Sequence, residues 1–184
     1  MATLTIELPA QKNQTAFNLR RWSELLADSE LGRDLAKVEG RIETDRHGHI
    51  IMYPPAHLPH GNYQSEIAYL LRTLLSNGRV ATECPISTAD GVKVADVTWI
   101  SLPRLTAIGE NICLTEAPEI CVEVLSASNS RIEMNEKKSL CFAAGAQEVW
   151  FCDQKGKMTF FLDAACVGQA SSVLCSQFPS RVEF

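Results

Sequence analysis

The sequence predicts an α/β or α+β protein, in which helices pack on a β-sheet. Helical and extended segments follow each other in the order helix, hairpin, helix, strands, helix, strands, which fits neither a helix bundle nor a β-sandwich. Several strands are short and almost continuously apolar, as expected for a sheet that is covered on both faces. The chain has 184 residues, of which 46% are hydrophobic. This length is enough for one substantial core, so we expect a single domain over 1–184.

The first third of the chain predicts helices followed by a hairpin. Residues 15–36 carry apolar side chains at helical intervals, with Gly32 as a break, which indicates one helix and a second short one. Two short extended stretches then flank the polar sequence TDRHGH, with Gly48 in the turn. Pro54 and Pro55 end the second stretch.

The middle of the chain contains the strongest helix signal and three strands. In HGNYQSEIAYLLRTLLSNGR the apolar residues form one stripe with a period of 3.6, and Asn77 and Gly78 form a stop signal. Strands follow in RVATECPIS, in VKVADVTWIS and, beyond a polar loop, in EICVEVLS.

The last third predicts a helix and two or three strands. The helix is SRIEMNEKKSLCFAAGA, with Ser128 or Ser130 as its N-cap and Gly145 near its end. The strands EVWFCD and MTFFLD are joined by the turn sequence QKGK. In the tail, the apolar run SSVLCSQF suggests an edge strand.

Charge and hydropathy exclude two classes of protein. A net charge of -5 and a pI near 5.4 argue against a protein that coats nucleic acid by bulk electrostatics, so any contact with DNA must be local. No apolar run approaches the roughly 18 residues of a membrane span. The N-terminus also lacks a basic start followed by an apolar stretch, and we expect a cytoplasmic protein.

The cysteines predict reduced thiols in the core and no structural zinc site. There are seven, an odd number, with no C-x-x-C pair. The four histidines lie between positions 47 and 60, far in sequence from most of the cysteines and without zinc-ligand spacing.

Two acidic residues interrupt apolar strands. Asp96 lies in VKVADVTWI and Glu123 lies in EICVEVLS. An ionised carboxylate in such surroundings loses several kcal/mol of hydration unless a cation or dense hydrogen bonding replaces it. If the two strands are neighbours, the carboxylates converge and repel each other unless a hard cation such as Mg²⁺ or Mn²⁺ lies between them.

A lysine on the following helix can join these acids. On a helical wheel, Lys137 lies within roughly 25° of the mean direction of the apolar residues, whereas Lys138 lies about 75° away. Lys137 is therefore expected to point toward the sheet. Its amine could pair with Glu123, orient a water nucleophile or stabilise a phosphate.

These residues resemble the PD-(D/E)xK nuclease superfamily, in which an Asp on one strand precedes an acid and a Lys. Within it, residues from about 38 to 155 resemble the bacterial restriction-endonuclease family labelled Uma-two, and 1–37 would be an N-terminal helical segment. The matching motifs are ADV at 95–97, VEVLSAS at 122–128, EKKSLCFAAGA at 136–146 and EVW at 148–150. The resemblance implies a restriction-endonuclease-like fold, with a central mixed β-sheet flanked by helices.

The resemblance also implies an activity and its residues. Asp96 and Glu123 would bind Mg²⁺ or Mn²⁺, the backbone carbonyl of Val124 would complete the protein ligands, and Lys137 would position or activate the attacking water. The family position of Glu66 is one that can approach the metal. The implied reaction is metal-dependent hydrolysis of DNA phosphodiester bonds, and the implied assembly is a homodimer.

Other residues carry weaker signals or depart from the family pattern. Glu83 and His60 are weaker candidates for the site than Glu66. Ala95 stands where the family has Pro, and Cys141 stands where it has Tyr. Leu125 occupies the position at which superfamily members carry the lysine, which the resembled family supplies from the helix, as Lys137 does here.

Two alternatives stay open. The chain could be a catalytically inactive nuclease-fold protein that acts as a binding or assembly module, with its acids and lysine forming a structural salt-bridge network. It could also hydrolyse another phosphate ester, since no residue pattern reads a base or a sugar. Taken together, Asp96, Glu123 and Lys137 favour the metal site.

Overall fold

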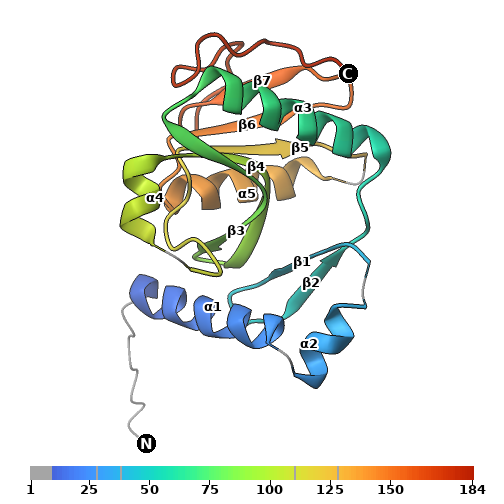
Figure 1. Cartoon of the computed structure of the whole chain (residues 1–184), viewed down its shortest axis with the longest axis vertical. Helices are drawn as coiled ribbons and strands as arrows, with labels where there is room; N and C mark the ends of the chain where they lie inside the picture. Colours follow the sequence, from blue (N-terminus) through green and yellow to red (C-terminus); the bar gives the residue numbers. More distant parts are fainter. Residues whose placement is uncertain (1–9, 28, 38, 110, 128) are drawn as a thin grey trace, which may run out of the picture.

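The computed structural model describes residues 10–27, 29–37, 39–109, 111–127 and 129–184 (Figure 1). Its elements are α1 (Ala10–Leu26), α2 (Glu30–Leu35), β1 (Arg41–Thr44), β2 (Ile50–Tyr53), α3 (Leu58–Leu74), β3 (Gly78–Thr88), β4 (Gly91–Ser101), α4 (Leu102–Ile108), β5 (Ile120–Val124), α5 (Arg131–Ala143), β6 (Glu148–Cys152) and β7 (Met158–Phe161). Among the described residues, no helix combines the length and the apolar character needed to cross a bilayer.

Five strands form one mixed sheet in the order β3-β4-β5-β6-β7. All neighbours are antiparallel except β5 and β6, which are parallel. A parallel pair needs a crossover connection, and α5 lies in that connection. The predicted class, a central mixed sheet flanked by helices, is confirmed.

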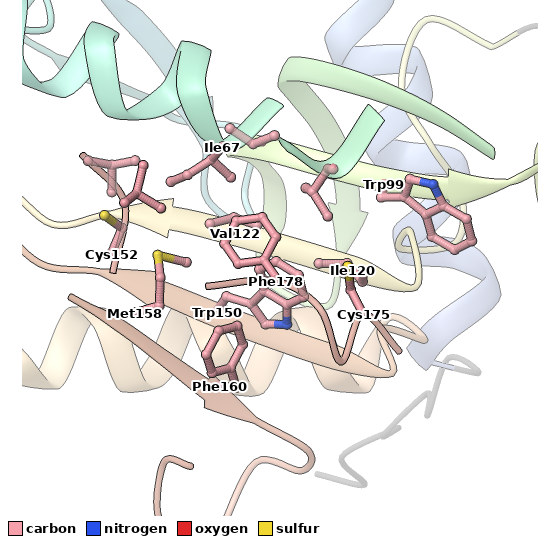
Figure 2. Close-up of a cluster of buried hydrophobic side chains, with 14 residues drawn as sticks. Ile67, Trp99, Ile120, Val122, Trp150, Cys152, Met158, Phe160, Cys175 and Phe178 are labelled. Carbon is pink, nitrogen blue, oxygen red and sulfur yellow. The ribbon is translucent and has the colours of Figure 1, made fainter. Parts of the chain in front are cut away.

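The sheet is covered on both faces, as the apolar strands predicted. On β5, Ile120, Val122 and Val124 pack in the cluster that contains the buried side of α3, whereas Cys121 packs in the cluster that contains the buried side of α5. Figure 2 shows the first cluster, which Trp150 helps to fill. Because side chains alternate along a strand, Glu123 projects to the same side as Cys121, toward α5.

The β1–β2 hairpin and α1 cover the part of β4 that extends beyond β5 (Figure 1). Only residues 97–99 of β4 pair with β5, so the earlier residues have no strand neighbour on that side. Side chains of β1 take over part of this role. Thr44 Oγ1 accepts from the N–H of Val92 at 2.9 Å, and Glu43 Oε1 accepts from the N–H of Val94 at 3.0 Å. Because these side chains accept hydrogen bonds from β4 in place of a neighbouring strand, the polar side of β1 faces the sheet.

Local sequence signals explain the start of α5 and the turn of the hairpin. Ser130 caps α5 by accepting from the N–H of Glu133, which decides between the two predicted caps. Gly48 has φ 79° in the predicted β1–β2 turn, a left-handed conformation that favours glycine.

All seven cysteines are free thiols, and all but the half-buried Cys166 are buried, as predicted.

Two expectations for the loops and the tail were wrong. The polar loop after β4 contains the short helix α4, capped by Ser101 and with Pro103 in its first turn. The tail run 171–178 forms turns and not an edge strand. Two of its N–H groups donate to a buried carboxylate, since Glu148 Oε1 accepts from Val173 and Leu174 at 2.8 Å each.

Candidate active site

Asp96 and Glu123 lie where the ladder between β4 and β5 ends. The last paired residues in this direction are Val97 and Val122, and the two acids follow one step beyond them. Both side chains are buried. Asp96 Oδ2 accepts from the N–H of Val124 at 2.7 Å, so a carboxylate replaces the next ladder contact. The condition under which the sequence brings the two acids together, that their strands are neighbours, is therefore met.

Strand β3, which pairs with β4 on its other edge, has an irregular backbone conformation opposite Asp96. Glu83 lies between Thr82 and Cys84, which both pair with β4, and it has φ 50°. A non-glycine residue in this region costs about 1 kcal/mol or more and is held only by surrounding contacts. Here the side-chain amide of Gln64 donates to Glu83 Oε1 and to the carbonyl of Asp96, both at 2.8 Å.

Lys137 joins the acids from α5. Its buried Nζ donates to Glu123 Oε2 at 2.8 Å and to the carbonyl of Val94 at 2.7 Å, and it lies 3.2 Å from Glu43 Oε1. Three acceptors thus surround the three donors of the ammonium group. Lys138 is also buried, which the helical wheel did not predict. Its Nζ lies 4.3 Å from the ring centroid of Phe161, a cation–π contact.

Arg41 and Glu43, two residues that the sequence reasoning missed, complete the group. Arg41 Nη1 lies 2.6 Å from Asp96 Oδ1, and its guanidinium lies 5.1 Å from the ring centroid of Tyr53. Glu43 is buried and lies between Lys137 and Arg41. A period of two in RIET puts both charged residues on one side of the strand, but only the docking of the hairpin reveals that this side faces inward.

Arg41, together with Asp96, Glu123 and Lys137, lines a cleft of about 380 Å³ between the hairpin, the start of α3 and α5. Of the predicted residues, Asp96, Glu123, Val124, Lys137, Glu83 and His60 all line it. His60 Nε2 lies 3.5 Å from Asp96 Oδ1. Glu66 is half-buried on α3 and does not line this cleft.

The electrostatic surroundings treat the two acids differently. Burial works against the charged form of Asp96, but hydrogen bonding to His60 and the charges of Arg41 and Lys137 outweigh it, so its pKa is lowered. Burial raises the pKa of Glu123 well above its usual value, against the opposing effect of Lys137, and the charge of Asp96 adds to the rise. Desolvation is thus the main reason why the surroundings favour the charged form of Glu123 less than that of Asp96.

The cleft residues fit a hard divalent cation. Glu123 Oε1 is buried and has no hydrogen-bond partner, an orphaned acceptor next to a second carboxylate. No group of three or more His, Cys, Asp or Glu side chains in the described part of the chain is arranged to hold an ion. Mg²⁺ commonly binds through one or two carboxylates and keeps several waters.

Comparisons with known proteins agree with this architecture. A family model described as "Putative restriction endonuclease" and named Uma2 matches residues 29–176. The fold is similar to that of a crystal structure of "a putative nuclease belonging to DUF820" from Anabaena variabilis, with a TM-score of 0.60 and 20% identity. That match covers 74% of this chain and 81% of the other. None of the curated proteins compared with the chain matches it. Since the family match spans most of the sequence, the chain belongs to the Uma2 family of restriction-endonuclease-like proteins.

Proposed function

We propose that this protein is a metal-dependent endonuclease that hydrolyses phosphodiester bonds of DNA. The family and the nuclease-like fold support the reaction class. The observation that carries the proposal is the buried, unpartnered Oε1 of Glu123 beside Asp96, with Lys137 bound to Glu123 in the same cleft. Converging acids whose pKa values are shifted in opposite directions are typical of catalytic sites.

Each residue has a distinct role in this proposal. Asp96 and Glu123 hold Mg²⁺ or Mn²⁺ together with the carbonyl of Val124. The cation, when bound, stabilises charge on the phosphate and lowers the pKa of a bound water. Lys137 orients the attacking water or stabilises charge on the phosphate. Glu43 and the carbonyl of Val94 keep the Lys137 ammonium in place, which supports a preorganised site.

The proposed partners are DNA and a second copy of the chain. A net charge of -5 restricts contact with DNA to local surfaces near the cleft. Two copies would supply one site for each strand of a duplex. Glu66 remains a proposed additional contributor near the metal, although its side chain lies outside the cleft lining.

A second candidate function is that of a catalytically inactive binding or assembly module. The contact of 2.6 Å between Arg41 and Asp96 favours it, because this contact partly neutralises the acids without a metal ion. In that case the carboxylates, Lys137 and Arg41 would form only a structural network. Dependence on a metal ion separates the two candidates.

Cleavage of supercoiled plasmid DNA tests the proposal. With Mg²⁺ or Mn²⁺ the wild type should produce nicked circles, and EDTA should stop this. Asp96→Asn, Glu123→Gln and Lys137→Met should each abolish nicking while remaining folded by circular dichroism. Lys138→Met is the matched control, since this neighbouring buried lysine contacts Phe161 and not the carboxylates, and it should retain activity. Full activity in any one of the three variants would remove that residue from the assignment.

A further inference from the structure

We propose that Arg41 is a displaceable counter-ion of the metal site, which occupies Asp96 in the metal-free protein and must release it before a divalent cation can bind. This inference rests on the proposed function and concerns its regulation. Because Arg41 lies on β1, the affinity for the metal ion would depend on the β1–β2 hairpin as well as on the carboxylates.

The first argument is the occupancy of the Asp96 carboxylate. Its Oδ2 accepts from the N–H of Val124 at 2.7 Å, and its Oδ1 lies 2.6 Å from Arg41 Nη1. Both oxygens therefore have a strong donor already. A divalent cation at Oδ1 would meet a unit positive charge within a few Å in a site that excludes much of the water, where like charges repel strongly. Release of Arg41 removes this conflict.

The second argument is that the guanidinium is held incompletely. Arg41 Nε is buried and has no hydrogen-bond partner. Nη1 thus makes a short ion pair with Asp96, whereas Nε makes no hydrogen bond. A buried polar group without a hydrogen-bond partner costs about 1–3 kcal/mol. A fully satisfied structural pair would not carry this penalty. The present position of Arg41 is thus one from which it can leave at reduced cost.

The third argument is that a second partner lies nearby. Glu83 Oε2 is 4.0 Å from Arg41 Nη1, and the Glu83 side chain is 48% exposed, so it can adjust to a moved guanidinium. The ring of Tyr53, with its centroid 5.1 Å from the guanidinium, helps to hold Arg41 in its present position by a cation–π contact. Arg41 can therefore exchange Asp96 for Glu83 without passing into bulk water.

Calorimetric titration with Mn²⁺ tests the inference. Arg41→Gln should lower the Kd for Mn²⁺ by about tenfold or more, because the energy spent in releasing a counter-ion reduces the apparent affinity of the wild type. Arg46→Gln is the matched control. Arg46 lies just after the same strand, its side chain is 61% exposed and it pairs with Asp90, so its loss should leave the Kd unchanged. Asp96→Asn should remove binding in both the wild-type and the Arg41→Gln background.

The outcomes separate this inference from the proposed function. If wild-type binding depends on Asp96 but Arg41→Gln binds no more tightly, the inference is refuted and the metal site stands. If neither protein binds Mn²⁺, the metal site and the inference both fail. Binding by Arg41→Gln but not by the wild type would support the inference strongly.

A second variant covers the case in which Arg41→Gln does not fold. Tyr53→Leu keeps the arginine but removes the ring that faces its guanidinium. It should weaken the hold of Arg41 on Asp96 and lower the Kd for Mn²⁺ in the same direction, by a smaller factor. Folding of each variant is checked by its thermal unfolding in EDTA. An unchanged Kd in a folded Tyr53→Leu protein would then overturn the inference.

Discussion

Lys137 Nζ lies 2.8 Å from Glu123 Oε2 in the interior of the protein, where it joins α5 to the central strand β5. Burial works against the charged amine, but Glu123 and Glu43 outweigh it and raise the pKa of Lys137. The pair is therefore both a structural link and part of the proposed catalytic group. Removing one member leaves the other as a buried group without its partner, which typically costs about 3–5 kcal/mol.

The first prediction concerns the stability of this pair. Lys137→Met should lower the free energy of unfolding by about 3 kcal/mol, because Glu123 loses its cation. The double variant Lys137→Met with Glu123→Gln should lose clearly less than the sum of the two single losses. Urea unfolding of the four proteins gives the coupling energy. Additive losses would show that the two side chains do not stabilise each other.

The second prediction concerns Glu43, which contacts Lys137 and fixes the backbone of β4. Glu43→Gln should lower the rate of nicking by about 10- to 100-fold, as expected for a residue that orients a catalytic group. Because Glu43 is not a proposed metal ligand, Mn²⁺ binding should persist, although its affinity can change. Glu39→Gln, an exposed change just before the same strand, is the control. Complete loss of Mn²⁺ binding in Glu43→Gln would instead make Glu43 a ligand.

The third prediction concerns the pH dependence of the hairpin turn. Desolvation opposes ionisation of Asp45, but hydrogen bonds from the His49 side chain and from the N–H groups of His49 and His47 outweigh it and lower its pKa from 3.8 to about 2. A carboxyl group with a lowered pKa stabilises the folded state above its unfolded value and loses this contribution as the pH falls through the folded value. Asp45 should therefore stabilise the protein fully above pH 3.8 and progressively less down to about pH 2.

Urea unfolding of the wild type and of Asp45→Asn between pH 2 and pH 5, roughly the window in which this group titrates, measures the effect. The difference in stability should be largest at the upper end and should shrink toward the lower end. A difference that does not change with pH would show that the ionised carboxylate of Asp45 does not contribute.

The fourth prediction concerns the C-terminal segment, which Glu148 holds against the sheet. Its carboxylate accepts from Trp150 Nε1 at 2.6 Å and from the Ser172 hydroxyl at 2.7 Å, besides the two backbone N–H groups of Val173 and Leu174. Glu148→Ala leaves these buried donors unpaired, and hydrogen bonds to a charged group contribute about 1.5–3 kcal/mol each. The free energy of unfolding should fall by roughly 3 kcal/mol or more.

Hydrogen exchange locates that effect. In Glu148→Ala the amides of residues 172–178 should lose protection before those of β5 and β6. Gln147→Ala, an exposed change at the adjacent position, should leave the protection of this segment intact. Unchanged protection in Glu148→Ala would mean that the apolar contacts of Phe178 and its neighbours suffice to hold the tail.

The sequence by itself determined the main helices, the strands of the central sheet and the two anomalous acids. Helices α3 and α5 follow from apolar side chains at a period of 3.6, and the buried strands follow from short apolar runs. Asp96 and Glu123 stood out because a carboxylate in such a run is costly, a property that can be read locally. The helical wheel of α5 alone showed that the Lys137 side chain points toward the sheet.

Only the tertiary structure decided how these acids are neutralised. Arg41 and Asp96 are 55 residues apart, and their contact depends on the docking of a short hairpin across the uncovered part of β4. Local periodicity shows that Arg41 and Glu43 share one side of a strand, but not which side is buried. The tail shows the same limit, since its apolar run forms turns in which the distant Glu148 accepts from two N–H groups. Contacts between distant segments set these outcomes, because hydrogen-bond partners and burial are properties of the packed chain and not of a sequence window.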